Sequence, residues 1–424
     1  MTAVSRAVRE TVSGLPRQFW WLWTSTLVNR LGGFVVTFLA LYLTVQRGYS
    51  ASYAGLVAAL FGLGGAAGAV VGGVLADRIG RRTTMLVAQL GGAVTTAVLG
   101  FVTHPLAIAV VATLVGLTSN ASRPALSAML ADLVRPEDRV RAFSLNYWAI
   151  NIGFGVSAAA AGFIASAGYL WLFLGDAFTT VLCAVLVFAK VKETLPRWEG
   201  HAADVGKASG PSEPHVGLMA VLRDQRFMAL VGLTFLLGSV MQQGSSTLAV
   251  DMGAHGLTAR QYGLVAAING LVIVVLQIPV TRALRARSSA GLLAAGSFLL
   301  AWGMGLTAFA GSVGLYALTV VVWTLGEIVH APASMSVVAD LAPATARGRY
   351  QGMYTLSWSA ATFAGPLVGG LTLDHLGRDA VWVGCALVGS VAGAGYYLLL
   401  RPRPTVIVSG PLDTAPAART TSSS

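Results

Sequence analysis

The stretch Gly73-Val74-Leu75-Ala76-Asp77-Arg78-Ile79-Gly80-Arg81-Arg82 separates two long apolar runs. Residues 48–76 contain no Asp, Glu, Lys or Arg, and neither do residues 83–122. About 20 apolar residues are enough to cross a bilayer as a helix. We therefore predict two membrane-spanning helices joined by a tight, charged link. Arginines on such a short link favour the cytoplasmic side of the membrane.

The composition extends this interpretation to the whole chain. Of the 424 residues, 55% are hydrophobic and only 11% are charged, whereas soluble domains carry about 25% charged residues. The chain has room for about twelve spanning helices, so we predict an all-α membrane protein. The expected helices cover residues 19–46, 52–76, 83–103, 106–134, 142–167, 169–189, 227–250, 258–281, 288–311, 313–342, 348–373 and 379–400.

The positive charge is distributed unevenly across these helices. With this topology, 23 of the 28 Lys and Arg residues fall on one side, which we predict to be cytoplasmic together with both termini. Arg47, Arg260 and Arg378 fall on the other side, while Arg30 and Arg123 lie inside helices. This asymmetry orients a membrane protein, so the net charge of +11 does not indicate nucleic-acid binding.

Changes in composition divide the chain into five segments. Residues 1–18 form a polar cytoplasmic lead-in, and residues 19–189 an N-terminal bundle of six helices. Charged residues and prolines make residues 190–226 a cytoplasmic linker. A C-terminal six-helix bundle covers residues 227–400, and the tail from 401 to 424 has a disordered composition.

An internal repeat relates the two bundles. A shift of 208 residues places Pro124 on Pro332 and Gly162 on Gly370, and residues 131–133 on residues 339–341 with the same Ala-Asp-Leu sequence. Many secondary transporters are built from two such repeats, with the binding site between them at the middle of the membrane.

The charged link and several later motifs resemble the major facilitator superfamily. The link follows its loop signature G-x-L-A-D-R-x-G-R-R, and the later motifs are most similar to twelve-helix bacterial drug:proton antiporters. They are Ser122-Arg123-Pro124, Gly326-Glu327, Arg347-Gly348-Arg349-Tyr350-Gln351-Gly352 and Gly365-Pro366-Leu367-Val368-Gly369-Gly370. In the helix at 142–167 the chain departs from the antiporter pattern, because Ser157–Gly162 lacks the expected proline. The resemblance therefore supports transport more firmly than export.

The resemblance implies a conformational switch in the charged link. It assigns this role to Gly73, Asp77, Arg78, Gly80, Arg81 and Arg82. In that family the acid, here Asp77, closes the cytoplasmic side against the start of the helix at 348–373. An anion at the positive end of a helix dipole explains why such a contact is stable.

Charges in the middle of apolar helices identify the candidate site, because each costs about 2.5–3.5 kcal/mol to insert and is usually functional. Arg30, Arg123 and Glu327 lie on three of the four helices that line the central cavity in the superfamily. We predict that Glu327 carries the coupling proton, with Asp176 as the next candidate. A structural ion pair between Glu327 and one arginine is the alternative; the other arginine is then free for an anionic, zwitterionic or carbonyl-rich ligand.

Neutral polar and aromatic side chains in the apolar helices extend the predicted substrate site. We assign substrate contacts to Asn29, Asn151, Gln242, Gln243 and Trp358. Interhelical hydrogen bonding is the competing explanation for the amides, and packing for the tryptophan.

The sequence favours a transporter over other classes of membrane protein. It contains no Walker loop, zinc-ligand spacing or Gly-x-Ser-x-Gly, and the stretch 190–226 has no catalytic constellation, which argues against an enzyme. We expect proton-coupled efflux of a small molecule by a monomer in the bacterial cytoplasmic membrane, with no metal and no cofactor besides the proton gradient. A proton-coupled importer of a small organic acid or peptide-like solute remains the alternative.

Overall fold

The computed structural model describes residues 14–135, 138–194, 218–284, 287–343 and 346–401. Most of the predicted lead-in (1–18), linker (190–226) and tail (401–424) lies outside these residues. All regular secondary structure in the described part is helical, as the apolar runs predicted.

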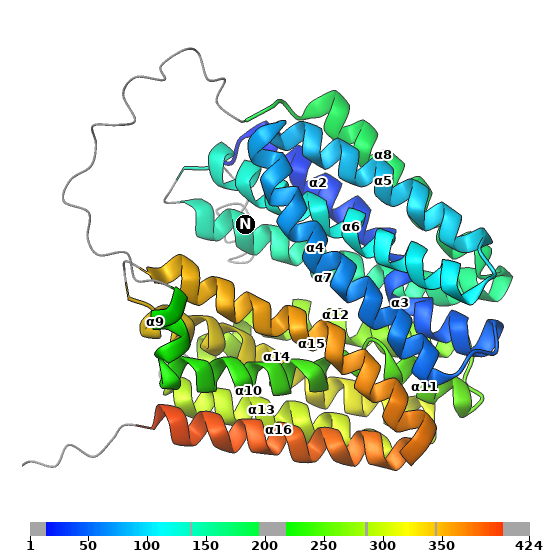
Figure 1. Ribbon diagram of the computed structural model, residues 1–424, viewed down its shortest axis with the longest axis vertical. Coiled ribbons are helices and arrows are strands. Elements are labelled where there is room, and N and C mark those ends of the chain that lie inside the picture. Colours follow the sequence, from blue (N-terminus) through cyan, green and yellow to red (C-terminus); the bar gives the residue numbers. More distant parts are fainter. Residues whose placement is uncertain (1–13, 136–137, 195–217, 285–286, 344–345, 402–424) are drawn as a thin grey trace, which may run out of the picture.

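The helices form two halves that follow one another in sequence (Figure 1). The first half contains α2 (Arg17–Leu31), α3 (Phe34–Leu41), α4 (Ala51–Arg78), α5 (Arg81–Phe101), α6 (Pro105–Leu133), α7 (Arg139–Ala167) and α8 (Leu170–Lys190). After the short α9 (Leu218–Arg223), the second half contains α10 (Gln225–Gln242), α11 (Thr247–Ala254), α12 (Ala259–Ala283), α13 (Ser289–Gly305), α14 (Val313–Leu341), α15 (Arg347–Leu376) and α16 (Arg378–Leu400).

Eleven helical stretches in the described residues are long and apolar enough to cross a membrane. The twelfth predicted span coincides with α15, whose 30 residues are long enough, although it begins with the polar sequence Arg-Gly-Arg-Tyr-Gln. The predicted architecture of two six-helix bundles is therefore confirmed.

Two predicted spans are interrupted, and the prediction of continuous helices was wrong there. The first span is divided between α2 and α3 at Gly32 and Gly33. A Cβ on Gly32 would lie 1.7 Å from the Thr179 hydroxyl oxygen, so only glycine lets α8 pack against the break. The seventh span is divided between α10 and α11 at Gln243-Gly-Ser-Ser246, where glycine and serine favour a turn over a helix. Both breaks lie at similar places in the two repeats.

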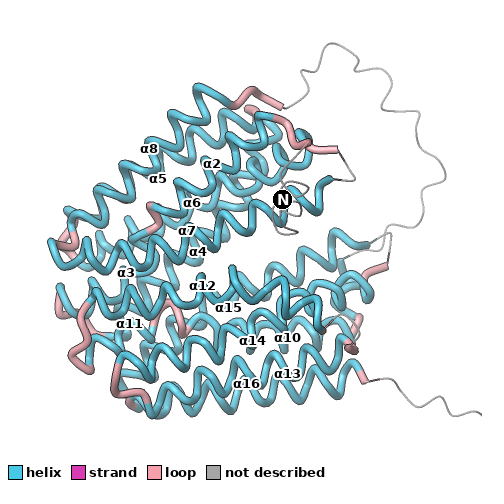
Figure 2. The backbone as a smooth tube through the Cα atoms, turned by 180° about the vertical axis from the view of Figure 1, so that it is seen from behind, coloured by secondary structure: helices cyan, strands magenta, loops and turns pink. Residues whose placement is uncertain are grey.

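The two halves approach each other at one end and separate toward the other, as Figures 1 and 2 show from opposite sides. We call the end with Lys190 and α9 the linker end, and the opposite end, with α3 and α11, the distal end. Near the distal end α4 packs against α15, and α3 packs against α11. The molecule is therefore closed between its halves at the distal end.

Close backbone packing and a carboxylate join α4 to α15 at the distal end. A Cβ on Gly55 of α4 would lie 2.3 Å from the carbonyl oxygen of Pro366 in α15. The carboxylate of Asp374, near the end of α15, accepts hydrogen bonds from the N–H groups of Ala51 (3.1 Å) and Ser52 (2.6 Å) at the start of α4. A carboxylate at a helix N-terminus satisfies free N–H groups and interacts favourably with the helix dipole.

Replacing Asp374 by alanine should loosen this distal contact. An exposed carboxylate at a helix N-terminus contributes about 0.3–1 kcal/mol, so we expect amide hydrogen exchange in the first turn of α4 to become roughly two- to fivefold faster. Asp379→Ala is the matched control, because Asp379 is an exposed acid in the first turn of α16 at the same end. Equal exchange rates in the two variants would show that Asp374 does not hold α4.

Candidate functional site

A cavity of about 550 Å³ lies between the two halves. Its walls come from α2, α3, α4, α5, α6 and α8 of the first half, and from α10, α15 and the α10–α11 break of the second. The contacts of α4 with α15 and of α3 with α11 lie on its distal side. The cavity therefore occupies the place between repeats that the sequence predicted for a binding site.

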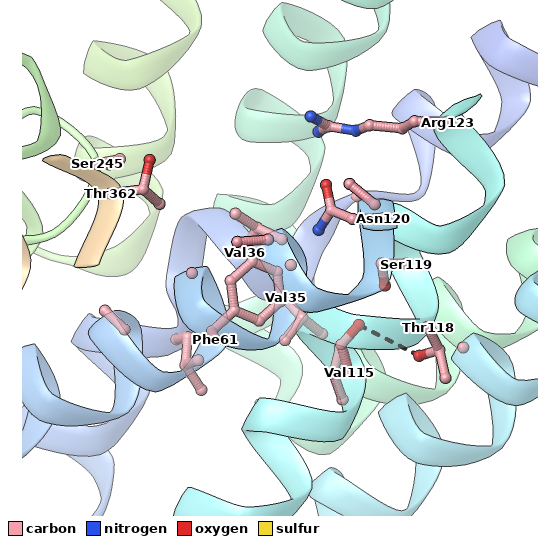
Figure 3. A pocket seen from close by; sticks show the side chains of 18 of the residues that line it. Val35, Val36, Phe61, Val115, Thr118, Ser119, Asn120, Arg123, Ser245 and Thr362 are labelled. Atoms are coloured by element: carbon pink, nitrogen blue, oxygen red, sulfur yellow. Dashed lines mark hydrogen bonds between the residues drawn. The ribbon is translucent and has the colours of Figure 1, made fainter. Parts of the chain in front are cut away.

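Two arginines from the first half line this cavity. Arg30 is the penultimate residue of α2, next to the Gly32–Gly33 break, and Arg123 lies on α6. In Figure 3 the Arg123 side chain extends from α6 into the open space, with Ser245 and Thr362 of the second half on the other side. Arg123 is exposed to this space, and the described part of the chain offers no hydrogen bond or ion pair to either guanidinium. Two cations are thus available to a ligand.

The second half contributes a wall without charge. Gln242 at the end of α10 and Trp358 on α15 line the cavity together with small hydroxyl side chains. On the first half, Asn29 of α2 also lines the cavity. The hydroxyl residues are Ser245, Ser246, Thr355, Ser359 and Thr362. The cavity therefore offers cations on one side, and hydrogen-bonding groups with one aromatic ring on the other.

Asp176 on α8 lines the same cavity. Its carboxylate accepts a hydrogen bond from the N–H of Val35 (3.2 Å), in the first turn of α3. The Phe34 backbone, the Thr180 side chain and the Arg30 guanidinium also lie close enough to interact with this carboxylate. Among the described residues that line the cavity, Asp176 is the one acid.

Glu327, by contrast, does not line the cavity. Its carboxylate on α14 accepts a hydrogen bond from Asn269 of α12 (3.1 Å), and Asn269 also donates to Thr324 (3.0 Å). Tyr147 of α7 lies close enough to experience its charge across the interface between the halves. The ion pair that the sequence suggested between Glu327 and an arginine is absent from the described structure.

Two predicted substrate contacts also lie away from the cavity, and their hydrogen bonds explain why. Asn151 is buried on α7 and donates to the carbonyl of Tyr147 (2.9 Å). Gln243 is buried in the α10–α11 break, where it donates to the carbonyls of Ser239 (3.0 Å) and Gly365 (2.8 Å) and accepts from Thr247 (2.5 Å). In this conformation Asn151 bonds within its own helix, whereas Gln243 joins the α10–α11 break to α15.

The charged link between α4 and α5 lies at the linker end and is held within the first half. Gly80 has φ of +99°, and a Cβ there would lie 2.5 Å from the Glu193 carboxylate. Glu193 accepts hydrogen bonds from the N–H groups of Arg81 (3.0 Å) and Arg82 (3.0 Å). Arg81 also forms an ion pair with Asp132, at the end of α6. Glycine is thus required for both the backbone conformation and the space.

The other predicted switch residues are at least partly exposed to solvent. Asp77 and Arg78 are exposed and Gly73 is half-buried. No hydrogen bond or ion pair to Asp77 is found among the described residues, so its expected contact with the start of α15 is not made in this conformation. Because the halves separate at this end, the contact would have to form in another conformation.

Sequence reasoning missed an ion cluster at the distal end of the second half. Asp251 of α11 is buried, contacts the guanidinium of Arg378 at 2.8 Å, and accepts a hydrogen bond from the Tyr316 hydroxyl (2.8 Å). Arg378 also donates to the carbonyls of Thr307 (2.7 Å) and Ala308 (2.6 Å). The acid between apolar residues 247–254 was the available signal. These contacts join α11 to α14, α16 and residues 307–308, all within the second half.

The chain matches the family model described as Major Facilitator Superfamily over residues 22–354 and 245–421. It is 30% identical to the uncharacterized MFS-type transporter YttB of Bacillus subtilis over 382 residues, which are 87% of this chain and 91% of that protein. It is 28% identical to the multidrug resistance protein MdtH of Escherichia coli over 366 residues, 82% of this chain and 84% of MdtH.

Solved structures share the fold at low sequence identity. A mutant of the nucleoside transporter NupG superposes with a TM-score of 0.77 at 15% identity, over 91% of this chain and all of that chain. A POT family transporter in complex with a thioalcohol-conjugated peptide gives 0.73 at 17% identity, over 92% and 96% of the two chains. These likenesses show the fold and leave the ligand open.

Proposed function

The chain belongs to the major facilitator superfamily, and from this premise we propose that it exports a small molecule by proton-coupled alternating access. One observation carries the proposal: a cavity between the two halves, closed at the distal end, is lined by two arginines that form no hydrogen bond or ion pair within the described part of the protein. The drug-resistance relative MdtH supports export.

The two arginines favour a substrate that carries an acidic group. Hydrogen bonds from a guanidinium to a carboxylate or phosphate are stronger than those between neutral groups. The Trp358 ring suits an apolar part of the molecule, and the hydroxyl side chains of the second half suit its uncharged polar groups. The candidates are therefore anionic, zwitterionic or carbonyl-rich compounds, and a compound with only a positive charge would be repelled.

The direction of coupling between substrate and proton narrows the class of substrate. Linkage is reciprocal, so an antiporter requires that substrate binding weaken proton binding at the coupling carboxylate. A purely anionic substrate would repel the ionised coupling carboxylate and so strengthen its binding of a proton. Substrate and proton would then be transported in the same direction. A substrate with an additional amino group near the carboxylate displaces the proton instead. Export therefore fits the zwitterionic class best.

We place the protein in the bacterial cytoplasmic membrane, as a monomer that works without a metal or bound cofactor. The uneven distribution of Lys and Arg puts the linker end, both termini and the charged link on the cytoplasmic side. With this orientation, the described conformation faces the cytoplasm. Asp77 would then contact the start of α15 once the cytoplasmic side closes.

Growth of efflux-deficient bacteria tests the proposal. Expression of the protein should raise the inhibitory concentration of zwitterionic antibiotics with cytoplasmic targets, leave that of purely cationic ones unchanged, and lose its effect when the pH gradient is dissipated. Cells with the empty vector provide the baseline. Greater sensitivity to the same zwitterions would instead indicate the alternative function, proton-coupled import of an organic acid or peptide-like solute.

A further inference from the structure

We propose that Asp176, rather than Glu327, is the proton site, and that its carboxylate locks the distal gate through the half-helix α3. The inference rests on the proposed proton coupling and names the residue responsible for it. Its basis is the position of Asp176, which lines the cavity and also accepts a hydrogen bond from the N–H of Val35 in the first turn of α3.

The break in the first span gives Asp176 a helix end to hold. A continuous helix would leave no free N–H groups here, but the interruption at Gly32–Gly33 creates a new N-terminus at Phe34. The Thr179 side chain, one turn after Asp176, occupies the space that a Cβ on Gly32 would fill. The fit of α8 into the break therefore fixes the carboxylate against the start of α3.

The other part of α3 forms the first half's side of the distal gate. The Tyr262 hydroxyl of α12 donates a hydrogen bond to the carbonyl of Thr37 (3.1 Å), and the Tyr262 ring packs edge-on against Phe38 at 5.1 Å between centroids. A Cβ on Gly253 of α11 would lie 2.9 Å from Leu41. Movement of α3 therefore changes the contact between the halves.

The charged groups around Asp176 are few. Arg30 of α2 interacts with both Asp176 and Arg123, and so couples the acid to the arginines of the cavity. On its own helix the nearest titratable group is Cys183. The sequence of α3 contains no titratable side chain, and the charged residues of α5 and α7 lie in their first three positions, at the linker end. The tyrosine of α7, Tyr147, lies further along the helix than these charged residues.

The arrangement explains how the protein without a ligand is kept from opening its distal end. The ionised carboxylate is attracted to the helix N-terminus and to Arg30, so it holds α3 in the closed position. A proton removes the charge and weakens this hold. The amino group of a zwitterion weakens the hold as well, because it draws the Asp176 carboxylate away from α3 and toward the cavity. Either ligand releases the gate, and the carrier without ligand stays locked.

Distances between spin labels at His104 and Gly311, in exposed turns at the distal ends of the two halves, test the lock without any substrate. In the otherwise unchanged protein, lowering the pH should shift the distance distribution toward longer distances. Asp176→Asn, which resembles the protonated acid, should give the long-distance population at every pH. Asp176→Glu should restore a pH-dependent distribution.

Glu327→Gln separates the two candidate acids, since it neutralises a carboxylate outside the cavity and retains an acceptor for Asn269. Its distances should follow pH as in the unmodified protein. The proposal is overturned if Asp176→Asn keeps the normal pH dependence, or if Glu327→Gln abolishes it. If Asp176→Asn fails to fold, Asp176→Ser replaces it under the same criteria. If the unmodified protein showed no uphill transport, the proposed function would be refuted, but the conclusion from the distances would not change.

Discussion

Replacing Arg123 by alanine should weaken binding of a carboxylate-bearing substrate by about 10- to 150-fold, because a hydrogen bond to a charged group contributes about 1.5–3 kcal/mol. The variant should fold normally, since Arg123 points into the cavity and makes no hydrogen bond within the described residues. Binding can be measured by tryptophan fluorescence, with Trp358 on the cavity wall as one reporter.

Arg223→Ala is the control for this prediction, because Arg223 is an exposed arginine on α9, away from the cavity. It should bind the substrate as the unmodified protein does. An ester of the same substrate, which lacks the negative charge, should lose little affinity in Arg123→Ala. Equal losses for the acid and the ester would show that Arg123 does not bind the acidic group.

Replacing Gly55 by alanine should prevent normal closure of the distal end. The added Cβ would lie 2.3 Å from the Pro366 carbonyl oxygen across the interface between the halves. Overpacking of this kind costs about 1–3 kcal/mol, which shifts the equilibrium away from the described conformation by roughly 5- to 150-fold. Transport in proteoliposomes should fall accordingly, whereas the melting temperature in detergent should change little, because each half stays intact.

Two other helical glycines provide the comparison. Gly68→Ala places its Cβ 2.0 Å from the Leu117 carbonyl oxygen, within the first half, so it should lower the yield of folded protein. Gly384→Ala meets no atom within 4 Å and should behave normally in both assays. If Gly55→Ala transported at the normal rate, the α4–α15 contact would not belong to the gate.

The sequence was sufficient for the architecture, because spanning helices depend on long apolar runs that are visible in one dimension. Most helix ends lie within a few residues of the prediction. The breaks at Gly32–Gly33 and at residues 243–246 were missed. Glycine is frequent in membrane helices, and only the fit of Thr179 against Gly32 distinguishes a break from ordinary close packing.

The candidate site was predicted in part. The structure brings together Asn29, Arg30, Arg123, Asp176, Gln242 and Trp358 around one cavity. It directs Asn151, Gln243 and Glu327 elsewhere, because depth along a helix says nothing about which face a side chain occupies. Gln242 and Gln243 are neighbours with opposite outcomes. The preference for Glu327 over Asp176 rested on its depth and on its place in a helix that lines the cavity in the resembling superfamily, whereas access to the cavity favours Asp176.

Movement of a radiolabelled zwitterion, chosen from the antibiotics that expression protects against, tests proton-coupled export most directly. Proteoliposomes are loaded at equal substrate concentration on both sides, a pH gradient is imposed, and protein-free liposomes give the passive background. We predict protein-dependent accumulation in the acidic compartment, because protons leaving it are exchanged for substrate entering it. Accumulation in the alkaline compartment, or none beyond the passive background, would contradict proton-coupled export.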